Sequence, residues 1–170
     1  MKNIKIEDLN INVYTKIAKD WMLVTAGNKD KYNTMTASWG QMGSLWGHGG
    51  GKPVVTIYIR PTRYTKEFIE KEDYFSLTFF SKDYHKDLSY LGTVSGRDED
   101  KVSKTLLTPA FDKKAPYFNE AEITLICRKL YAQDILADNF IDKTIIDDNY
   151  PIRDFHTMYI GEIEEILVKE

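Results

Sequence analysis

The sequence predicts a mainly β domain with helices inserted between its strands, and three observations lead to this fold class. Apolar strand-like stretches recur along the 170 residues, two long ones lie near the end, and helical periodicity is confined to short segments between them. A doubly wound parallel sheet would need regular strand–helix alternation, which the last two long strands break. We therefore expect a single domain over residues 1–170, a small β-barrel of about five or six strands decorated by helices.

The first elements form a predicted hairpin. Residues 7–18 read as a lead-in segment with a short helical turn, and Trp21–Ala26 is apolar enough for a strand. Gly27–Lys31 supplies turn residues that lead into a second strand over Asn33–Trp39. Gln41–Lys52 contains five glycines and no periodicity, so we expect a loop there.

The middle of the chain alternates strand and helix. Lys52–Ile59 is a nearly continuous apolar run, which indicates a strand covered on both faces. Thr62 is a candidate N-cap for a helix that ends near Lys71. Tyr74–Phe80 then alternates as a strand, with its aromatic and leucine side chains on one face.

A second helix is predicted over Ser81–Leu91, where Gly92 is suited to end it. Ser95–Asp98 has the composition of a turn, and Asp98 can cap a short helix that runs to Lys104.

Two long strands close the chain, around Ile123–Tyr131 and His156–Val168, and Gly161 inside the second indicates a β-bulge. Leu106–Ala115 reads as a connector. Residues 138–153 are acidic and irregular, which favours an excursion from the domain over a second domain.

Composition excludes several classes of function. The net charge of −3 argues against nucleic acid as the main partner. The single cysteine, Cys127, lies in an apolar run and excludes an intramolecular disulfide and a cysteine-based cluster. The three histidines are too scattered for a metal triad, so no metal is expected. No signal peptide and no membrane-spanning run is predicted, which makes the cytoplasm the default location.

The distribution of charge hints at an anion-binding region. Residues 138–170 hold nine acidic and three basic side chains, so the positive charge lies in the preceding part of the chain. Arg60 and Arg63 stand where a helix is predicted to begin, and cations there oppose the helix dipole unless an anion is present. Together with Thr65 they predict a phosphate site. Ordinary surface ion pairing is the alternative.

The strand over Asn33–Trp39 carries a row of hydroxyls. Its alternation puts Thr34, Thr36 and Ser38 on one face and the side chains of Met35, Ala37 and Trp39 on the other. Buried hydroxyls need hydrogen-bond partners. This strand is therefore either a solvated edge strand or the wall of a ligand site.

Four segments in order resemble the flavin reductase-like family with the FMN-binding split β-barrel fold, in its flavoredoxin-like branch. They are Asn33–Gly40, Arg60–Thr65, Phe79–Ser81 and Gly92–Asp98. The resemblance extends from about Trp21 to Val168 and implies FMN as the cofactor. The cofactor carries the electrons, so no catalytic side chain is implied.

In this resemblance the hydroxyl strand runs alongside FMN, the arginine segment holds its phosphate, and the ring meets the strand end before the second helix. It implies these cofactor-binding residues: Thr34, Met35, Thr36, Ala37, Ser38, Trp39, Arg60, Arg63, Thr65, Phe80, Ser81, Ser95, Arg97 and His156. Alternatives stay open for some of them. Phe80 can belong to the core, Ser81 can be an N-cap, Arg97 can pair with Asp100, and His156 can be a packed histidine.

The resemblance implies an FMN-binding redox protein and a homodimer. Its electron donor is NADH, NADPH or a protein, and its acceptor a flavin or a protein partner. Many reductases of this fold have a histidine in the stretch equivalent to Gly92–Asp98, which here lacks one, and this favours a carrier or a weak reductase. The alternatives are a flavin-binding module without turnover by NAD(P)H and a structural barrel that binds no ligand.

Overall fold

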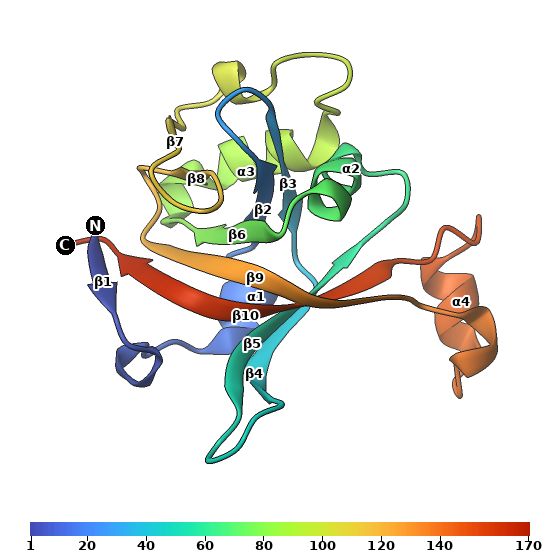
Figure 1. The fold of residues 1–170 in the computed structure, drawn as a ribbon. Helices are drawn as coiled ribbons and strands as arrows, with labels where there is room; N and C mark the ends of the chain where they lie inside the picture. Colours follow the sequence, from blue (N-terminus) through green and yellow to red (C-terminus); the bar gives the residue numbers. More distant parts are fainter.

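The structure is a computed structural model that describes residues 1–170, and it is dominated by an eight-stranded antiparallel sheet in the order β3-β2-β6-β9-β10-β5-β4, with β1 paired to β10 (Figure 1). The two ends of this path, β3 and β4, are separated in the chain by only Ser38 and Trp39. Because two residues span only a short distance, the sheet must curl back on itself. The predicted mainly β barrel with inserted helices is confirmed.

The strands of the main sheet are β1 (Lys2–Ile4), β2 (Met22–Gly27), β3 (Tyr32–Ala37), β4 (Gly40–Leu45), β5 (Lys52–Ile59), β6 (Tyr74–Phe79), β9 (Ile123–Asp134) and β10 (Thr157–Val168). A separate two-stranded sheet pairs β7 (Pro109–Ala110) with β8 (Tyr117–Phe118). The helices are α1 (Val13–Ala18), α2 (Tyr64–Lys71), α3 (His85–Thr93) and α4 (Thr144–Asn149). Short 3₁₀ turns cover Ile6–Asp8, Lys82–Tyr84, Val102–Lys104 and Ala137–Asn139.

The inside of the curled sheet holds a core of 19 buried apolar residues. Phe75, Leu77 and Phe79 of β6 all point into it, as their alternation predicts. Cys127 is fully buried in the same core, and burial raises the pKa of its thiol. A second apolar cluster lies under α3 and includes Phe80. These two clusters fix the sheet and α3 relative to each other.

The β10 bulge at Gly161 is confirmed by a register shift between Ile160 and Gly161 opposite β9. A methyl group on Gly161 would lie 2.6 Å from Cζ of Phe75 and 3.1 Å from Cβ of Cys127. The strand therefore needs glycine where it crosses the core side chains.

The expected loop over Gln41–Lys52 is wrong in its first half, because β4 pairs antiparallel with β5 over that stretch. Only the tip between the two strands is irregular, and three of its residues are Gly49, Gly50 and Gly51. The glycines obscure a strand whose stability comes from pairing with a neighbour rather than from its own composition. The expected count of five or six strands is low because neither β4 nor the short β1, which pairs with β10, is predicted.

Three helix boundaries also differ from the predictions. Arg63, not Thr62, occupies the N-cap position of α2 and makes no side-chain cap. Helix α3 continues past Gly92 to Thr93, and Gly92 instead allows close contact with β3, since an added Cβ would lie 3.1 Å from Cβ of Thr36. Asp98 does not cap the short helix that follows, because its amide closes the predicted turn by donating to the Ser95 carbonyl. The capping hydrogen bond, from the Ser103 amide, goes instead to the side chain of Asp100.

The acidic excursion over residues 138–153 is not wholly irregular, because α4 forms within it. This segment and the adjoining ends of β9 and β10 make an arm that projects from the barrel, on the right of Figure 1. The two termini lie side by side at the opposite end of the sheet. No helix has the length and apolar character needed to cross a membrane.

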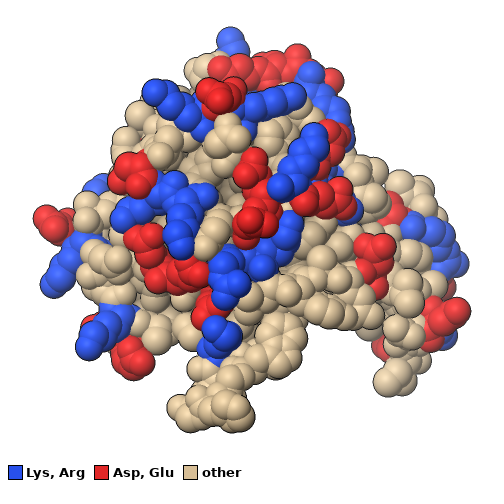
Figure 2. Space-filling view, viewed as in Figure 1, with Lys and Arg blue, Asp and Glu red and all other residues tan.

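Charged side chains of both signs cover much of the face shown in Figure 2, whereas the tip of the β4–β5 hairpin at the bottom is free of them. Residues 41–51 contain no Lys, Arg, Asp or Glu. The tip carries the exposed apolar side chains of Leu45 and Trp46.

Candidate functional site

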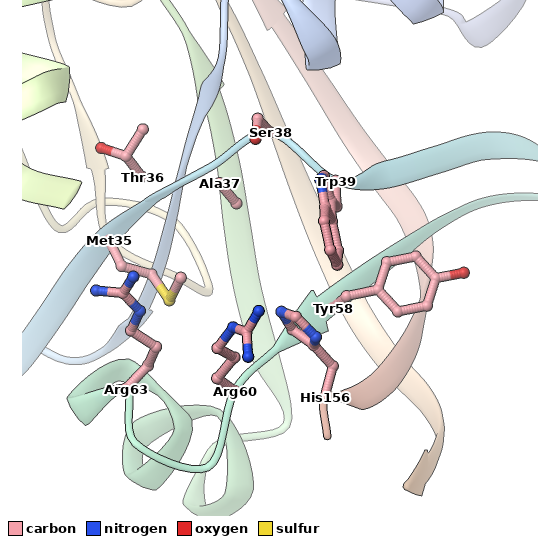
Figure 3. A pocket seen from close by; sticks show the side chains of 9 residues that line it. All are labelled: Met35, Thr36, Ala37, Ser38, Trp39, Tyr58, Arg60, Arg63 and His156. Carbon is pink, nitrogen blue, oxygen red and sulfur yellow. The ribbon is translucent and has the colours of Figure 1, made fainter. Parts of the chain in front are cut away.

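A hollow of about 260 Å³ opens where β3, β5 and β10 approach one another (Figure 3). Its wall is formed by Met35, Thr36, Ala37, Ser38, Trp39, Tyr58, Arg60, Arg63 and His156. Eight of these nine residues belong to the predicted cofactor-binding set, from three segments far apart in the sequence. We call this space the first hollow.

The strand β3 presents its less polar face to the first hollow, with Met35, Ala37 and Trp39 directed toward it in Figure 3. Two of the three hydroxyls on the opposite face, those of Thr34 and Thr36, are used inside the fold. Thr34 Oγ1 lies 2.8 Å from Thr25 Oγ1 and is fully buried, and the hydroxyl of Thr36 donates to the Leu88 carbonyl of α3. These two threonines therefore attach β3 to its neighbours.

Arg60 lines the first hollow, but its guanidinium already has protein partners. Nη1 lies 2.7 Å from Oδ1 of Asp154, and Nη2 donates to the Asn149 carbonyl at 2.8 Å. The group also lies over the Tyr150 ring, 5.0 Å from its centroid. Most of the charge of Arg60 is therefore compensated by the arm that carries α4.

His156 lies directly before β10, with 7% of its surface exposed. Its ring centroid is 5.1 Å from that of Trp39, and its Nδ1 is 2.8 Å from the phenolic oxygen of Tyr150. Burial, aided by the nearby Arg60 cation, lowers the pKa of His156 to about 4. The imidazole is thus neutral at physiological pH.

A second, smaller hollow of about 60 Å³ lies beside the first, and the two share Met35 and Arg63 in their walls. The rest of the second hollow comes from β3, the start of α2, the end of α3 and the segment after it: Asn33, Thr62, Tyr64, Thr65, Leu91, Thr93, Val94, Ser95, Gly96 and Lys101. It contains two cations and no carboxylate.

The two cations of the second hollow face carbonyl groups at the end of α3. Lys101 is 4% exposed, and its Nζ donates to the carbonyls of Leu91 at 2.7 Å and Val94 at 2.9 Å. Arg63 donates to the carbonyl of Gly92 at 3.0 Å. Burial, with Arg63 nearby, lowers the pKa of Lys101 to about 8. The partial negative charge of a helix end compensates only part of two full positive charges.

Comparison with known proteins identifies the family. The profile of the flavin reductase like domain matches residues 14–170. The chain belongs to the flavin reductase-like family. The recognition made from the four segments is therefore confirmed, and none of the curated proteins gives a significant sequence match.

Solved structures of flavin reductase-like proteins share the fold. Flavoredoxin from Methanosarcina acetivorans superposes with a TM-score of 0.68 at 23% identity, over 100% of this chain and 77% of its own. An FMN-binding protein from Thermus thermophilus gives a TM-score of 0.66 at 18% identity, over 100% of this chain and 83% of its own. A protein with a split barrel domain from Shewanella frigidimarina gives 0.66 at 17% identity, over 97% of this chain and 77% of its own. The predicted split-barrel fold is confirmed.

The remaining predicted residues of this flavin reductase-like chain lie outside the first hollow. Thr65 is fully buried and its hydroxyl accepts from Nδ2 of Asn33 at 2.7 Å, although it and Ser95 border the second hollow. Arg97 pairs with Glu67 rather than with Asp100.

Phe80 and Ser81 line a separate hollow of about 210 Å³ between α3 and the segment that precedes β2. Phe80 is buried in the α3 cluster, and Ser81 precedes a 3₁₀ turn without capping it through its side chain. The structure therefore does not bring these two residues together with the first hollow, and their contact with a flavin ring stays a prediction.

Sequence reasoning missed three residues of this flavin reductase-like site. Tyr58 falls in a run that predicts a buried strand, Tyr150 falls in a segment that predicts irregular structure, and Lys101 carries no distinguishing pattern. An isolated lysine after a run of acidic residues reads as a surface side chain. Only the packing of the segment after α3 buries it.

Proposed function

We propose that this protein binds FMN along the two adjoining hollows, with the ring in the first and the phosphate at the second. The observation that carries the proposal is the pair Arg63 and Lys101 in a wall without a carboxylate. A phosphate dianion supplies the charge that this wall lacks. The shared residues Met35 and Arg63 make the two hollows neighbours, as the two ends of one ligand require.

At the phosphate end, the first amides of α2 add to the two cations. The amides of Tyr64 and Thr65 have no partner within the helix, whereas that of Lys66 already donates to the Arg63 carbonyl. Ser95 contributes a hydroxyl to the same wall. Arg60 is a weaker phosphate ligand than the sequence indicates, because Asp154 compensates its charge.

At the ring end, the first hollow offers one apolar and one polar side. Trp39, Ala37 and Met35 provide flat and apolar contact for an aromatic ring. His156 and the backbone of residues 36–38 provide hydrogen-bonding groups for its polar edge. With 260 Å³ the hollow is small for a ligand of this size, for which sites of about 300–1,000 Å³ are usual. A second subunit is expected to complete it.

Bound FMN supplies the redox chemistry, and the protein's own residues bind it, orient it and set its surroundings. We propose an FMN-dependent oxidoreductase or electron carrier that receives electrons from NADH, NADPH or a protein donor and passes them to a flavin or protein acceptor. Membership of the flavin reductase-like family and similarity to a flavoredoxin support this range of roles.

The test is an absorption spectrum of the purified protein followed by anaerobic additions. Bleaching of bound FMN within seconds by NADH or NADPH identifies a reductase and its donor. A yellow protein that only reduced ferredoxin or another protein donor can bleach is a carrier. A yellow protein that no donor reduces is a flavin-binding module without turnover. A colourless protein that leaves FMN fluorescence unchanged overturns the proposal.

We further propose that the protein is a homodimer. The uncharged tip of the β4–β5 hairpin exposes Leu45 and Trp46, which are 37% and 47% accessible. Apolar side chains on a projecting hairpin are typical of a surface that a partner covers. The first hollow, which lies between β3 and β5, is open enough to receive a wall from a second copy.

A further inference from the structure

Tyr150 lies behind His156, on the arm that carries α4, and does not line the first hollow. We propose that Tyr150 is a positioning residue that fixes His156 in the Nε2–H tautomer, so that the first hollow presents an N–H donor to its ligand. The nature of that ligand rests on the proposed function, whereas the tautomer itself does not.

The contact between the two rings is short and enclosed. The phenolic oxygen lies 2.8 Å from Nδ1 of His156, and the rings meet edge to face with centroids 5.5 Å apart. Tyr150 is 3% exposed, and its ring is packed against Phe140 and Phe155. The phenol therefore has little freedom to turn away from the imidazole.

The direction of this hydrogen bond follows from the available partners. The phenolic group has no other hydrogen-bond partner in the protein. If Nδ1 were the donor, the buried phenolic hydrogen would have no acceptor, which is costly. Imidazole nitrogen is also a much stronger acceptor than a phenolic oxygen. Tyr150 therefore donates to Nδ1, and the single hydrogen of the neutral imidazole must be on Nε2.

The surroundings keep both rings in these forms. The titratable and charged groups that face them come from the end of β5, from the turn that follows it and from the arm: Tyr58, Arg60, Arg63 and Asp154. Burial raises the pKa of Tyr150 and lowers that of His156, so the phenol keeps its proton and the imidazole stays neutral.

The second ring nitrogen is open to the first hollow. Nε2 of His156 makes no hydrogen bond within the protein. It is nevertheless not fully buried, because the fully buried side-chain atoms without a partner are only Thr78 Oγ1, Thr124 Oγ1 and Tyr159 OH. His156 lines the first hollow, where Figure 3 shows its ring between Arg60 and Tyr58. The donor therefore selects a ligand edge with acceptor atoms, such as the carbonyl and N5 edge of an oxidised flavin.

The test uses nitrogen-15 NMR of the His156 ring in the flavin-free protein at pH 7. Wild-type protein is expected to show a protonated Nε2 and an acceptor Nδ1. Tyr150→Phe keeps the ring but removes the donor, so we expect a mixture of both tautomers and a His156 pKa about one unit higher. The matched control is Tyr131→Phe, which removes an exposed phenol of β9 bonded to Gln133. It should leave the His156 spectrum unchanged.

Riboflavin affinity provides the functional readout, with two further variants of His156. His156→Gln can place an amide N–H near the Nε2 position, whereas His156→Asn can place one only near Nδ1. We expect Gln to retain affinity within about threefold and Asn to lose about tenfold, as for one lost hydrogen bond.

Three outcomes would overturn the inference: a proton on Nδ1 in the wild type, an unchanged tautomer in Tyr150→Phe, or equal affinities for the Gln and Asn variants in a protein that binds riboflavin. If the protein binds no flavin, the proposed function fails, while the NMR result decides the tautomer independently.

Discussion

Arg60 and Asp154 form a direct ion pair, with Nη1 of Arg60 2.7 Å from Oδ1 of Asp154. Arg60 follows the end of β5, and Asp154 precedes β10, so the pair joins the wall of the first hollow to the arm that carries α4. The second guanidinium nitrogen bonds the Asn149 carbonyl of the same arm. Arg60 therefore shapes the hollow through this attachment, whereas Arg63 keeps a charge that no carboxylate in either wall compensates.

Arginine substitutions should separate these two roles. Arg63→Ala is expected to weaken FMN by at least about tenfold while changing riboflavin affinity little, because only FMN has a phosphate whose charge-assisted hydrogen bond is lost. Arg60→Ala is expected to weaken both ligands to a similar extent, since it loosens the arm behind His156. Fluorescence quenching titrations with the two flavins measure both effects. A selective loss of FMN in Arg60→Ala alone would return the phosphate to that arginine.

The affinity for FMN should depend on pH through Lys101. Its pKa of about 8 means that the free protein loses the ammonium charge as pH rises through that value. A bound phosphate favours the charged form, so FMN affinity should fall as the pH rises from about 8 toward 10, and riboflavin affinity should not. Lys101→Met preserves the length of the side chain and should abolish the pH dependence. If the pH dependence of FMN affinity persists in this variant, a group other than Lys101 is responsible for it.

The same pKa predicts how Lys101 affects stability without ligand. Its folded pKa is below the usual 10.4 of lysine, so the unfolded chain binds more protons between about pH 8 and 10.4. The free energy of unfolding therefore rises with pH across that window. This gain is lost as the pH falls through about 8, because Lys101 is then charged in both the folded and the unfolded protein. Urea unfolding at pH 7 and pH 9.5 tests this. The free energy of unfolding of the wild type should gain relative to that of Lys101→Met at the higher pH.

Gly161→Ala should destabilise the fold by about 1–3 kcal/mol, because the new methyl group overlaps the Phe75 ring in the barrel core. The control is Gly43→Ala in β4, where an added Cβ meets nothing within 4 Å and φ is ordinary. That variant should be neutral or slightly more stable. Denaturant midpoints of the two variants at equal slope decide the matter. If Gly161→Ala were as stable as Gly43→Ala, the bulge would have to shift at no cost to accommodate the methyl group.

The proposed dimer places the hairpin tip in an interface. Leu45→Asp and Trp46→Asp should each shift the protein toward the monomer, because a buried unpaired charge opposes association. Leu106→Asp is the control, since Leu106 is an even more exposed apolar residue and lies in the connector before β7, away from the hairpin. Sedimentation velocity at several concentrations gives the result. Dimers of unchanged stability in both hairpin variants would exclude the tip from the interface.

Much of the fold was predictable because alternation and turn residues act over short distances. The hairpin of β2 and β3, the core face of β6 and the bulge in β10 all follow from local pattern. The strand β4 was missed because its stability comes from its pairing with β5, and its glycine-rich sequence has no apolar period. The end of α3 lies two residues beyond the predicted Leu91 for a similar reason, since the contact of Gly92 with Thr36 is tertiary.

For the candidate site, local pattern was likewise enough to select residues but not to assign their roles. Residues 34–39, the arginine segment and the last strand with His156 could be selected from the sequence, because their order resembles that of the flavin reductase-like family. Their roles could not. The hydroxyls of Thr34 and Thr36 are used inside the fold, and Phe80 and Ser81 border another hollow.

The sequence by itself determined the family, the barrel class and the segments that meet at the first hollow. Only the tertiary structure decided which atoms of those segments remain free. Asp154 compensates Arg60, Tyr150 occupies one nitrogen of His156, and Lys101 is buried beside Arg63. The reason is physical: charge compensation and hydrogen-bond direction depend on distances between residues up to 94 positions apart, which no local pattern encodes.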